Sequence, residues 1–121
     1  MKLEEATILA LQGKLTESKD IKSTVYEVVN KALINLEQND LVVDYKINEV
    51  NLYEENKISF TVIITLGEAQ GLSATYLAKD LQKELEEKLT NVNSVGVAGE
   101  KYTHYRTHDK CINLLINIAT K

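Results

Sequence analysis

The sequence contains no proline and only one cysteine among its 121 residues. Without proline, no helix interior is interrupted and no X–Pro isomerisation slows folding. The single cysteine, Cys111, excludes an internal disulfide framework and indicates a reducing compartment. Long apolar runs are also missing, and Glu4 and Glu5 lie in the first segment, which argues against a signal peptide or a membrane span. We therefore expect a cytoplasmic protein with no membrane partner.

A block of basic residues is missing as well. Acids outnumber bases 18 to 14, the formal net charge is −4, and the two signs are interspersed. Duplex-binding proteins usually have a basic surface, because phosphate neutralisation supplies much of their affinity. The charge balance therefore disfavours nucleic acid as a partner. The 44% hydrophobic and 26% charged residues are typical of a globular chain, so we expect residues 1–121 to form a single domain with its own core.

One stretch combines two clear periodic patterns. Between Ile58 and Leu66 apolar residues occupy alternate positions, and only Ile63 departs from the rule. Period two with β-branched residues predicts a strand with one buried face. From Ser73, a candidate N-cap, to Leu89 the apolar residues follow the stripe of an amphipathic helix. Both elements must bury their apolar sides against a common core.

Two helices are expected before this stretch. Residues 2–12 form a short helix that Gly13 closes, and Lys14–Asp20 reads as a linker with cap candidates. Residues 1–17 therefore hold an N-terminal helix and part of its linker. A stronger helix begins near Ile21 and ends at Asn39–Asp40. Its apolar stripe consists of Ile21, Val25, Val28, Val29, Ala32, Leu33 and Leu36.

The segment after this helix is predicted to be a strand whose phase slips. Val43, Tyr45 and Ile47 share one face, whereas Val50 has the opposite parity. A β-bulge near Asn48–Glu49 restores the burial, and the alternative is a strand that ends near Asn48 and starts again. The bulge would place the later apolar residues on the same side of the strand as the earlier ones.

A polar turn, Glu54–Lys57, joins this strand to the Ile58–Leu66 strand and predicts a hairpin. Its arms reach about ten residues, longer than the usual five or six. We therefore expect the hairpin to project beyond the sheet. Near the C-terminus, Ser94–Tyr105 and Cys111–Ala119 are expected to form two more strands around a turn at Arg106–Asp109.

The resulting order is α-β-β-α-β-β after the short N-terminal helix. Moving the last strand to the front gives β-α-β-β-α-β, the ferredoxin-like arrangement. The sequence thus predicts an α+β two-layer sandwich, a permuted ferredoxin-like fold with a mostly antiparallel four-stranded sheet and two helices on one face. The other face is either open or covered by the N-terminal helix. If it is open, Ser59, Thr61, Ile63 and Thr65 line it, and Ile63 forms an exposed apolar pair with Leu115.

The densest group of reactive side chains lies between His104 and Cys111. His104, His108 and Cys111 are the only metal-ligand candidates, but the spacing H-x3-H-x2-C fits no known zinc pattern. A solvated turn followed by a core cysteine is the interpretation that we adopt, with no metal and no cofactor. Cysteine–histidine catalysis is disfavoured because Cys111 opens an apolar strand and nothing marks an activated thiol. No convergent catalytic set emerges, and we expect no enzyme activity.

The sequence resembles the tail-terminator proteins of long-tailed bacteriophages in its order of elements. The matching parts are the hairpin Val43–Leu66, the helix Ser73–Leu89, and Gly99–Asp109 ahead of Ile112–Ala119. Together with the helix that precedes the hairpin and the connecting segments, the resemblance covers about four-fifths of the chain, whereas the first twenty residues have no counterpart.

The resemblance implies a hexameric ring that stops growth of the tail tube and joins tail to head, with location in the virion. Such rings assemble through hairpins and sheet edges and carry out no catalysis. The contact residues implied are Glu54, Glu55, Asn56 and Lys57 in one hairpin tip, and Tyr102, Tyr105 and Arg106 near the other. The partners implied are further copies of the chain or other structural proteins.

Two other classes of function are compatible with the residues. The acidic balance and the lack of a catalytic set also suit a small acidic regulator or inhibitor that binds one protein partner. A ferredoxin-like module that binds a small ligand or a metal around His104, His108 and Cys111 is the third class. A strongly negative face on a monomer favours the regulator, and metal retained after purification favours the metal-binding module.

Overall fold

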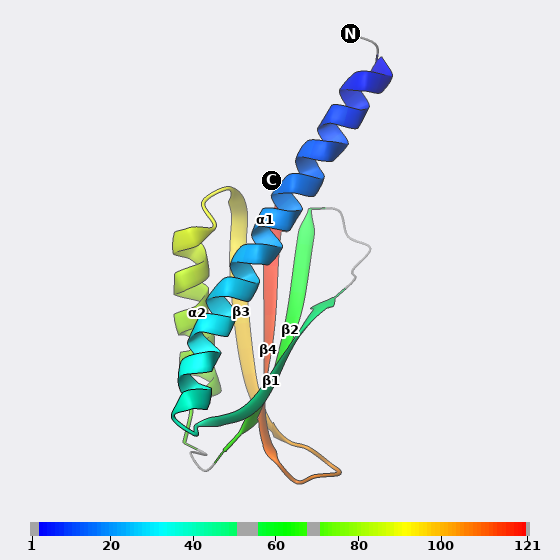
Figure 1. The fold of residues 1–121 in the computed structure, drawn as a ribbon. Helices are drawn as coiled ribbons and strands as arrows, with labels where there is room; N and C mark the ends of the chain where they lie inside the picture. The colour runs from blue at the N-terminus through cyan, green and yellow to red at the C-terminus, as the bar shows by residue number, and fades with distance from the viewer. Residues whose placement is uncertain (1–2, 51–55, 68–70, 121) are drawn as a thin grey trace.

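The chain forms two helices and a four-stranded antiparallel sheet in the order α-β-β-α-β-β, as predicted (Figure 1). This computed structural model describes residues 3–50, 56–67 and 71–120, with side chains described from Asp20 onward. The elements are α1 (Leu3–Gln38), β1 (Val42–Val50), β2 (Lys57–Leu66), α2 (Ala74–Lys88), β3 (Val92–Thr103) and β4 (Lys110–Thr120).

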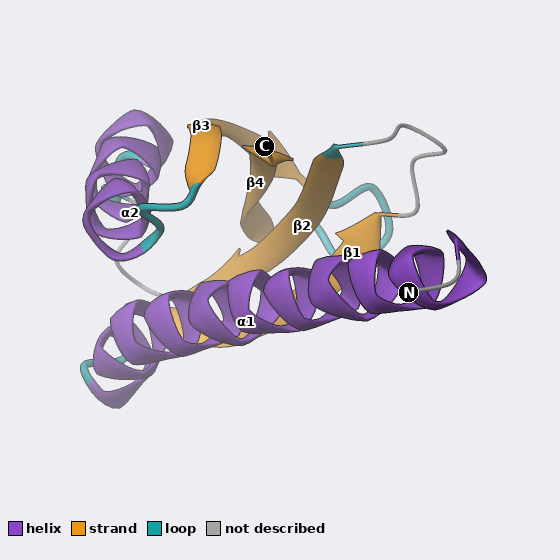
Figure 2. Cartoon of the chain, turned by 90° about the horizontal axis from the view of Figure 1, so that it is seen from above, coloured by secondary structure: helices purple, strands orange, loops and turns teal. Residues whose placement is uncertain are grey.

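The sheet has the strand order β1-β2-β4-β3, so β1 and β3 form its two edges. Both helices cover the same face, α1 over the β1–β2 side and α2 beside β3 (Figure 2). Alternate residues of β2 and β4 point into the space between sheet and helices, as their period-two patterns predict. The largest fully buried side chains there include Phe60, Ile64, Leu114 and Ile116 from the sheet and Leu33, Leu81 and Leu85 from the helices.

The N-terminal region is one helix of 36 residues, so the prediction of a short helix and a linker is wrong. The helix runs through Gly13 and the whole of Lys14–Asp20. A glycine inside a helix costs only about 1 kcal/mol relative to alanine, and no proline is present to force a break. At the junction the Thr24 hydroxyl donates to the Asp20 carbonyl oxygen four residues earlier, at 2.9 Å, within continuous helical geometry.

The predicted end of this helix is confirmed. α1 ends at Gln38, and Asp40 takes a left-handed backbone conformation with φ of 59°. The Leu41 N–H donates to the Leu36 carbonyl, which closes the last turn. Asn39 adds a side-chain hydrogen bond to the carbonyl of Asn35.

The register irregularity of β1 lies between Val42 and Asp44, not near Asn48–Glu49. Val42 pairs with Leu66 and is buried, whereas Val43 is 64% exposed instead of sharing a buried face with Tyr45. The early position follows from the tight entry into the strand, where Gly67 N–H donates to the Leu41 carbonyl. From there to Val50 the pairing with β2 is continuous.

The described part of the β1–β2 hairpin lies within the sheet, and the tip of the predicted projecting arm lies outside the described residues. Its arms are nine and ten residues long, as expected. However, β2 pairs with β4 without interruption from Lys57 to Thr65, so a strand on its other side holds it along its length. Residues 51–55, which include Glu54 and Glu55 of the predicted tip, lie outside the described residues.

The helix predicted from Ser73 to Leu89 is confirmed with both of its caps. The Ser73 hydroxyl accepts a hydrogen bond from the Tyr76 N–H, and Leu89 is the C-cap. The first turn of α2 lies directly over Gly99 of β3, where a Cβ atom would be 2.5 Å from the Ala74 carbonyl oxygen. Gly99 therefore allows the helix to approach the sheet at this point.

Neither α1 nor α2 contains, in its described residues, a stretch long and apolar enough to cross a membrane.

Candidate interaction surface

The face of the sheet opposite the helices carries no helix in the described part of the chain (Figure 2). We call this surface the open face. The strand registers arrange its side chains in four rows that each cross β1, β2, β4 and β3. In that strand order the rows are Asp44-Thr65-Cys111-Tyr102, Lys46-Ile63-Asn113-Glu100, Asn48-Thr61-Leu115-Ala98 and Val50-Ser59-Asn117-Gly96.

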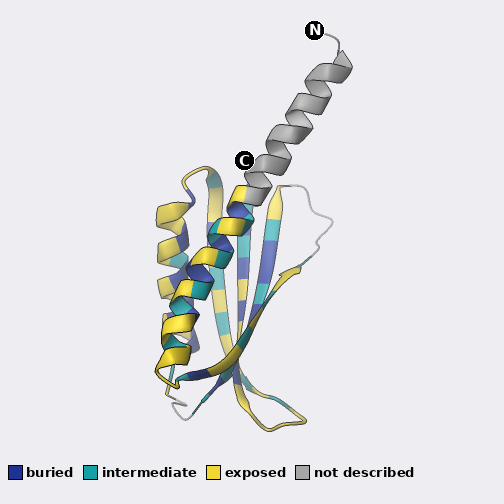
Figure 3. Ribbon diagram, viewed as in Figure 1, coloured by how far each residue is buried: buried dark blue, intermediate teal, exposed yellow. Residues whose placement is uncertain are grey.

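Two large apolar side chains of the open face are exposed. Ile63 is 37% exposed and Leu115 is 39% exposed, and they come from the two central strands in adjacent rows. This confirms the predicted apolar pair on an open sheet face, and Figure 3 shows the alternation of buried and exposed positions along the strands. Exposed apolar residues at the centre of a sheet are typical of a surface that another protein covers.

Charged groups lie at both ends of the row that contains Ile63. Lys46 lies on the β1 edge and Glu100 on the β3 edge, with Ile63 and Asn113 between them. Both are exposed, and neither takes part in an ion pair in the described part of the structure. Lys46 and Glu100 are not among the contact residues predicted from the sequence, because their relation depends on the registers of three strand pairs.

A buried polar contact lies at one end of the open face. The Ser59 hydroxyl donates to Asn117 Oδ1 at 2.6 Å, and Ser59 is only 1% exposed. The bond satisfies a hydroxyl that would otherwise be desolvated without a partner. The bond joins β2 and β4 in the row that begins with Val50 on β1.

At the other end, Tyr102 and Cys111 are side-chain neighbours. Burial raises the pKa of Tyr102 above the ordinary 10.0, and interaction with the Cys111 thiol adds to the shift. On one side of Tyr102 lies a shallow hollow of about 370 Å³, lined by Thr61, Ile63, Glu100, Tyr102 and Asn113. The predicted contact residue Tyr102 thus belongs to the open face.

Alkaline titration tests the environment of this residue and of Tyr45. Burial, with smaller contributions from Glu37 and Asp44, also raises the pKa of Tyr45 above 10.0. A raised pKa in the folded state means that the unfolded chain releases the proton first. The stabilisation is therefore complete below pH 10.0 and is lost as the pH rises through the folded pKa.

In phenolate absorbance, we expect Tyr45 and Tyr102 to ionise at a higher pH than an ordinary tyrosine, and Tyr45→Phe and Tyr102→Phe should each remove one late-ionising group. Titration curves that keep both late groups in the two variants would contradict the assignment.

Backbone groups of β1 and β3 point outward at the two sheet edges, and side chains accept hydrogen bonds from some of them. The Val97 N–H donates to Gln82 Oε1 at 3.0 Å, so it points away from β4. On the other edge, the Tyr45 N–H donates to Asp44 Oδ1 at 2.8 Å and points away from β2. Because antiparallel ladders alternate, every second residue of each edge strand directs its N–H and C=O outward, including Glu49 on β1.

The turn between β3 and β4 is organised by local contacts. The His104 ring stacks on the Tyr105 ring at 5.3 Å, and the Arg106 guanidinium lies 5.4 Å from the centre of the same tyrosine ring. His104 Nδ1 accepts hydrogen bonds from the N–H groups of Arg106 and Thr107. Tyr105 is 76% exposed, so the predicted contact residues Tyr105 and Arg106 are available at this tip.

The two predicted contact regions lie at opposite ends of the sheet (Figure 1). Of the first tip only Asn56 and Lys57 are described, and the Asn56 carbonyl accepts a hydrogen bond from the Thr120 N–H. Tyr102, Tyr105 and Arg106 lie at or beside the other tip. One small partner therefore does not contact both regions at once.

The metal-ligand candidates are not gathered into one site. His104 Nδ1 is engaged with the turn backbone, and the Cys111 thiol is buried with its Sγ 3.7 Å from the Asp109 carbonyl oxygen. His108 has a left-handed backbone with φ of 58° on the far side of the turn. Within the described ranges, no group of three histidine, cysteine or acidic side chains is placed to hold a metal ion.

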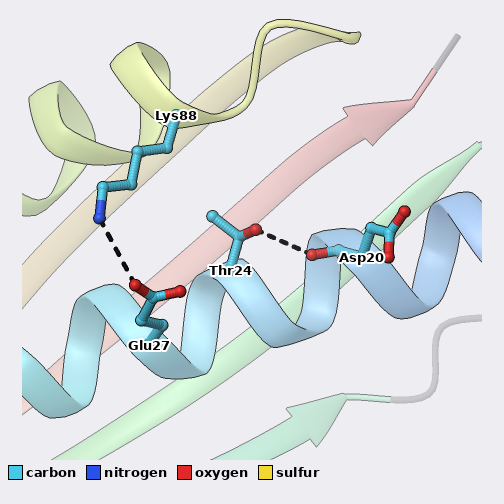
Figure 4. Close-up of polar contacts among 4 residues, drawn as sticks. All are labelled: Asp20, Thr24, Glu27 and Lys88. Atoms are coloured by element: carbon cyan, nitrogen blue, oxygen red, sulfur yellow. Dashed lines mark hydrogen bonds and ion pairs between the residues drawn. The ribbon is translucent and has the colours of Figure 1, made fainter.

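A smaller pocket, of about 150 Å³, lies where α1 passes the end of α2, and Asp20, Thr24 and Lys88 contribute to its wall. Lys88 Nζ is 3.9 Å from Glu27 Oε1, which connects the two helices (Figure 4). Both side chains are largely exposed, so the pair contributes little to stability. The pocket is the gap where two helices meet. The open face is the stronger candidate for function.

Comparison of this chain with known proteins identified no relative. No protein-family model, no curated protein and no solved structure matches this chain.

Proposed function

We propose that this protein is a non-enzymatic assembly subunit that forms a homo-oligomer by joining sheet edges. The observation that carries the proposal is the relative direction of the edge strands. β1 is antiparallel to β2, β2 to β4, and β4 to β3, so the two edges run in opposite directions. The β3 edge of one copy can therefore pair antiparallel with the β1 edge of the next, which continues the sheet between copies.

Such a contact is heterologous, because it joins two different edges. A repeated heterologous contact forms a ring when the rotation between copies closes, and an open filament when it does not. This geometry supports the resemblance to the tail-terminator proteins of long-tailed bacteriophages, with the chain as one subunit of a ring that completes a phage tail. The position of β4 between β2 and β3 supports the permuted ferredoxin-like sandwich as the underlying fold.

Proline at Glu49 tests the edge contact. Proline is tolerated on an edge strand where the replaced N–H faces outward, but it cannot donate to a neighbouring strand. Glu49 is exposed, and its carboxylate pairs with Lys22 Nζ at 2.7 Å. Glu49→Ala removes the same ion pair and keeps the N–H, so it is the matched control.

We expect the wild type to have a multi-copy mass in light scattering and a ring in electron micrographs. Glu49→Pro should abolish the ring, whereas Glu49→Ala should keep it, with circular dichroism confirming that both variants fold. A wild type that is strictly monomeric at high concentration, or a Glu49→Pro variant that still forms rings, would overturn the proposal.

A further inference from the structure

We propose that the open face binds the open face of a second copy, about a two-fold axis parallel to the strands. This contact goes beyond the proposed ring, because it uses the strand faces and needs no backbone hydrogen bond from either sheet edge. Its basis is the pattern of charge, apolar side chains and relief across the four rows.

A two-fold axis along the strands fixes which residues meet. Rotation about this axis places β1 over β3 of the second copy and β2 over β4, while each row stays opposite itself. In the charged row, Lys46 then lies opposite Glu100 of the second copy, and Glu100 lies opposite its Lys46. The symmetry makes this ion pair twice, and each involves two exposed groups without an ion-pair partner in the described part of the chain.

An axis across the strands gives the opposite result. Each strand then faces its own copy, and an axis through the charged row brings Lys46 opposite the Lys46 of the second copy and Glu100 opposite its Glu100. An axis midway between this row and the next places Lys46 opposite Asn48 and Glu100 opposite Ala98, so no ion pair forms. Like charges placed opposite each other disfavour an interface strongly. The charges therefore select the axis that runs along the strands.

The relief of the open face agrees with the same axis. Ile63 of the second copy comes opposite Asn113, which lines the hollow of about 370 Å³. The other walls of that hollow are Thr61, Glu100, Tyr102 and the copy's own Ile63. The two Ile63 side chains therefore approach each other at the hollow, and Leu115 lies opposite Thr61 in the next row. Self-complementarity of this kind is what an isologous contact requires.

The size of the face corresponds to a small interface. Four strands about 4.8 Å apart that carry four rows about 6.7 Å apart give a flat footprint of roughly 500 Å². Ser59 and Cys111 are buried, so the area that each copy offers is below the roughly 800 Å² per partner of a standard interface. Two sheets that stack face to face in this way are separated by about 10 Å, as in a β-sandwich.

The first test introduces a charge at the centre of the open face. Ile63→Lys places an ammonium group in the hollow of the second copy, whereas Ile34→Lys adds the same charge at a similarly exposed isoleucine, 44% against 37%, on α1. Both are made in the Glu49→Pro background, which removes the edge contact. By sedimentation equilibrium, we expect a dimer for Glu49→Pro alone and with Ile34→Lys, and a monomer with Ile63→Lys.

The second test exchanges the two charges in the same background. Lys46→Glu alone and Glu100→Lys alone each bring like charges together at two symmetric positions, and each should raise the dimer Kd about tenfold or more. The double variant restores the attraction with reversed signs, and its Kd should return close to that of the parent. A double variant as weak as the singles would overturn the pairing of Lys46 with Glu100.

The outcomes separate this inference from the proposed ring. A Glu49→Pro variant that is monomeric while the wild type forms rings would overturn the face contact and leave the ring standing. A wild type that has the same dimeric mass as Glu49→Pro would overturn the ring and support the face contact. A monomeric wild type would overturn both, and an Ile34→Lys variant as disruptive as Ile63→Lys would also overturn the face contact.

Discussion

Replacing Phe60 with alanine is expected to lower the free energy of unfolding by about 3–5 kcal/mol. Phe60 is fully buried on β2, and its ring meets the Tyr26 ring of α1 edge to face, with the centroids 5.9 Å apart. The substitution removes the largest fully buried side chain and one of the contacts that hold α1 on the sheet. The loss is a large fraction of the 5–15 kcal/mol that typically stabilises a domain.

Urea unfolding followed by circular dichroism measures this effect. Tyr76→Ala is the control, because Tyr76 is another aromatic residue but is 71% exposed on α2. Its loss should change the free energy of unfolding by no more than about 0.5 kcal/mol. A loss below about 1 kcal/mol for Phe60→Ala would show that α1 does not depend on this contact.

Adding a single methyl group at Gly99 is expected to destabilise the fold by about 1–3 kcal/mol. The new Cβ atom would lie 2.5 Å from the Ala74 carbonyl oxygen and 2.9 Å from Leu114 Cδ2. The leucine side chain can rotate, but the carbonyl belongs to the first turn of α2. The helix must therefore move away from the sheet, and its cap at Ser73 moves with it.

Gly96→Ala on the same strand is the matched control, since a Cβ atom there meets nothing within 4 Å. Restricting the unfolded chain should make this variant neutral or more stable by up to about 1 kcal/mol. Thermal unfolding of the two variants side by side checks the difference. Equal melting temperatures would show that α2 can move without cost.

The two effects bear on the proposed assembly in different ways. Phe60 and Gly99 lie on the helix-covered side of the sheet, whereas Ile63, Lys46 and Glu100 lie on the open face. Substitutions on the first side are expected to change stability before they change assembly. Substitutions on the second are expected to change assembly with little effect on the isolated domain, because exposed side chains contribute little to folding.

Much of the fold could be predicted from local patterns. The alternation from Ile58 to Leu66 and the helical stripe after Ser73 each arise from residues that are neighbours along the chain. The exposed pair of Ile63 and Leu115 also followed from parity, because a residue out of phase with a buried face must lie on the other one. These inferences needed only the periods of the strand and the helix.

Other features could not be read from local patterns. Gly13 and the polar residues of Lys14–Asp20 predicted a break in the helix. Glycine costs a helix only about 1 kcal/mol, so a single helix forms in place of the predicted helix and linker. The bulge of β1 lies at Val42–Asp44 because the tight entry near Gly67 sets the register before the apolar phase does. Local periodicity favours a bulge at Asn48–Glu49, whereas the pairing of β1 with β2 places it between Val42 and Asp44.

The sequence by itself determined the α+β class, the order of the elements and which side of each central strand is buried, because these depend on side-chain periodicity. Only the tertiary structure decided that β4 lies between β2 and β3 and that Lys46 shares a row with Glu100. Residues 54 positions apart become members of one row through three strand registers, and a shift of one residue in any of them would send a side chain to the other face. The candidate surface is therefore a property of the assembled sheet.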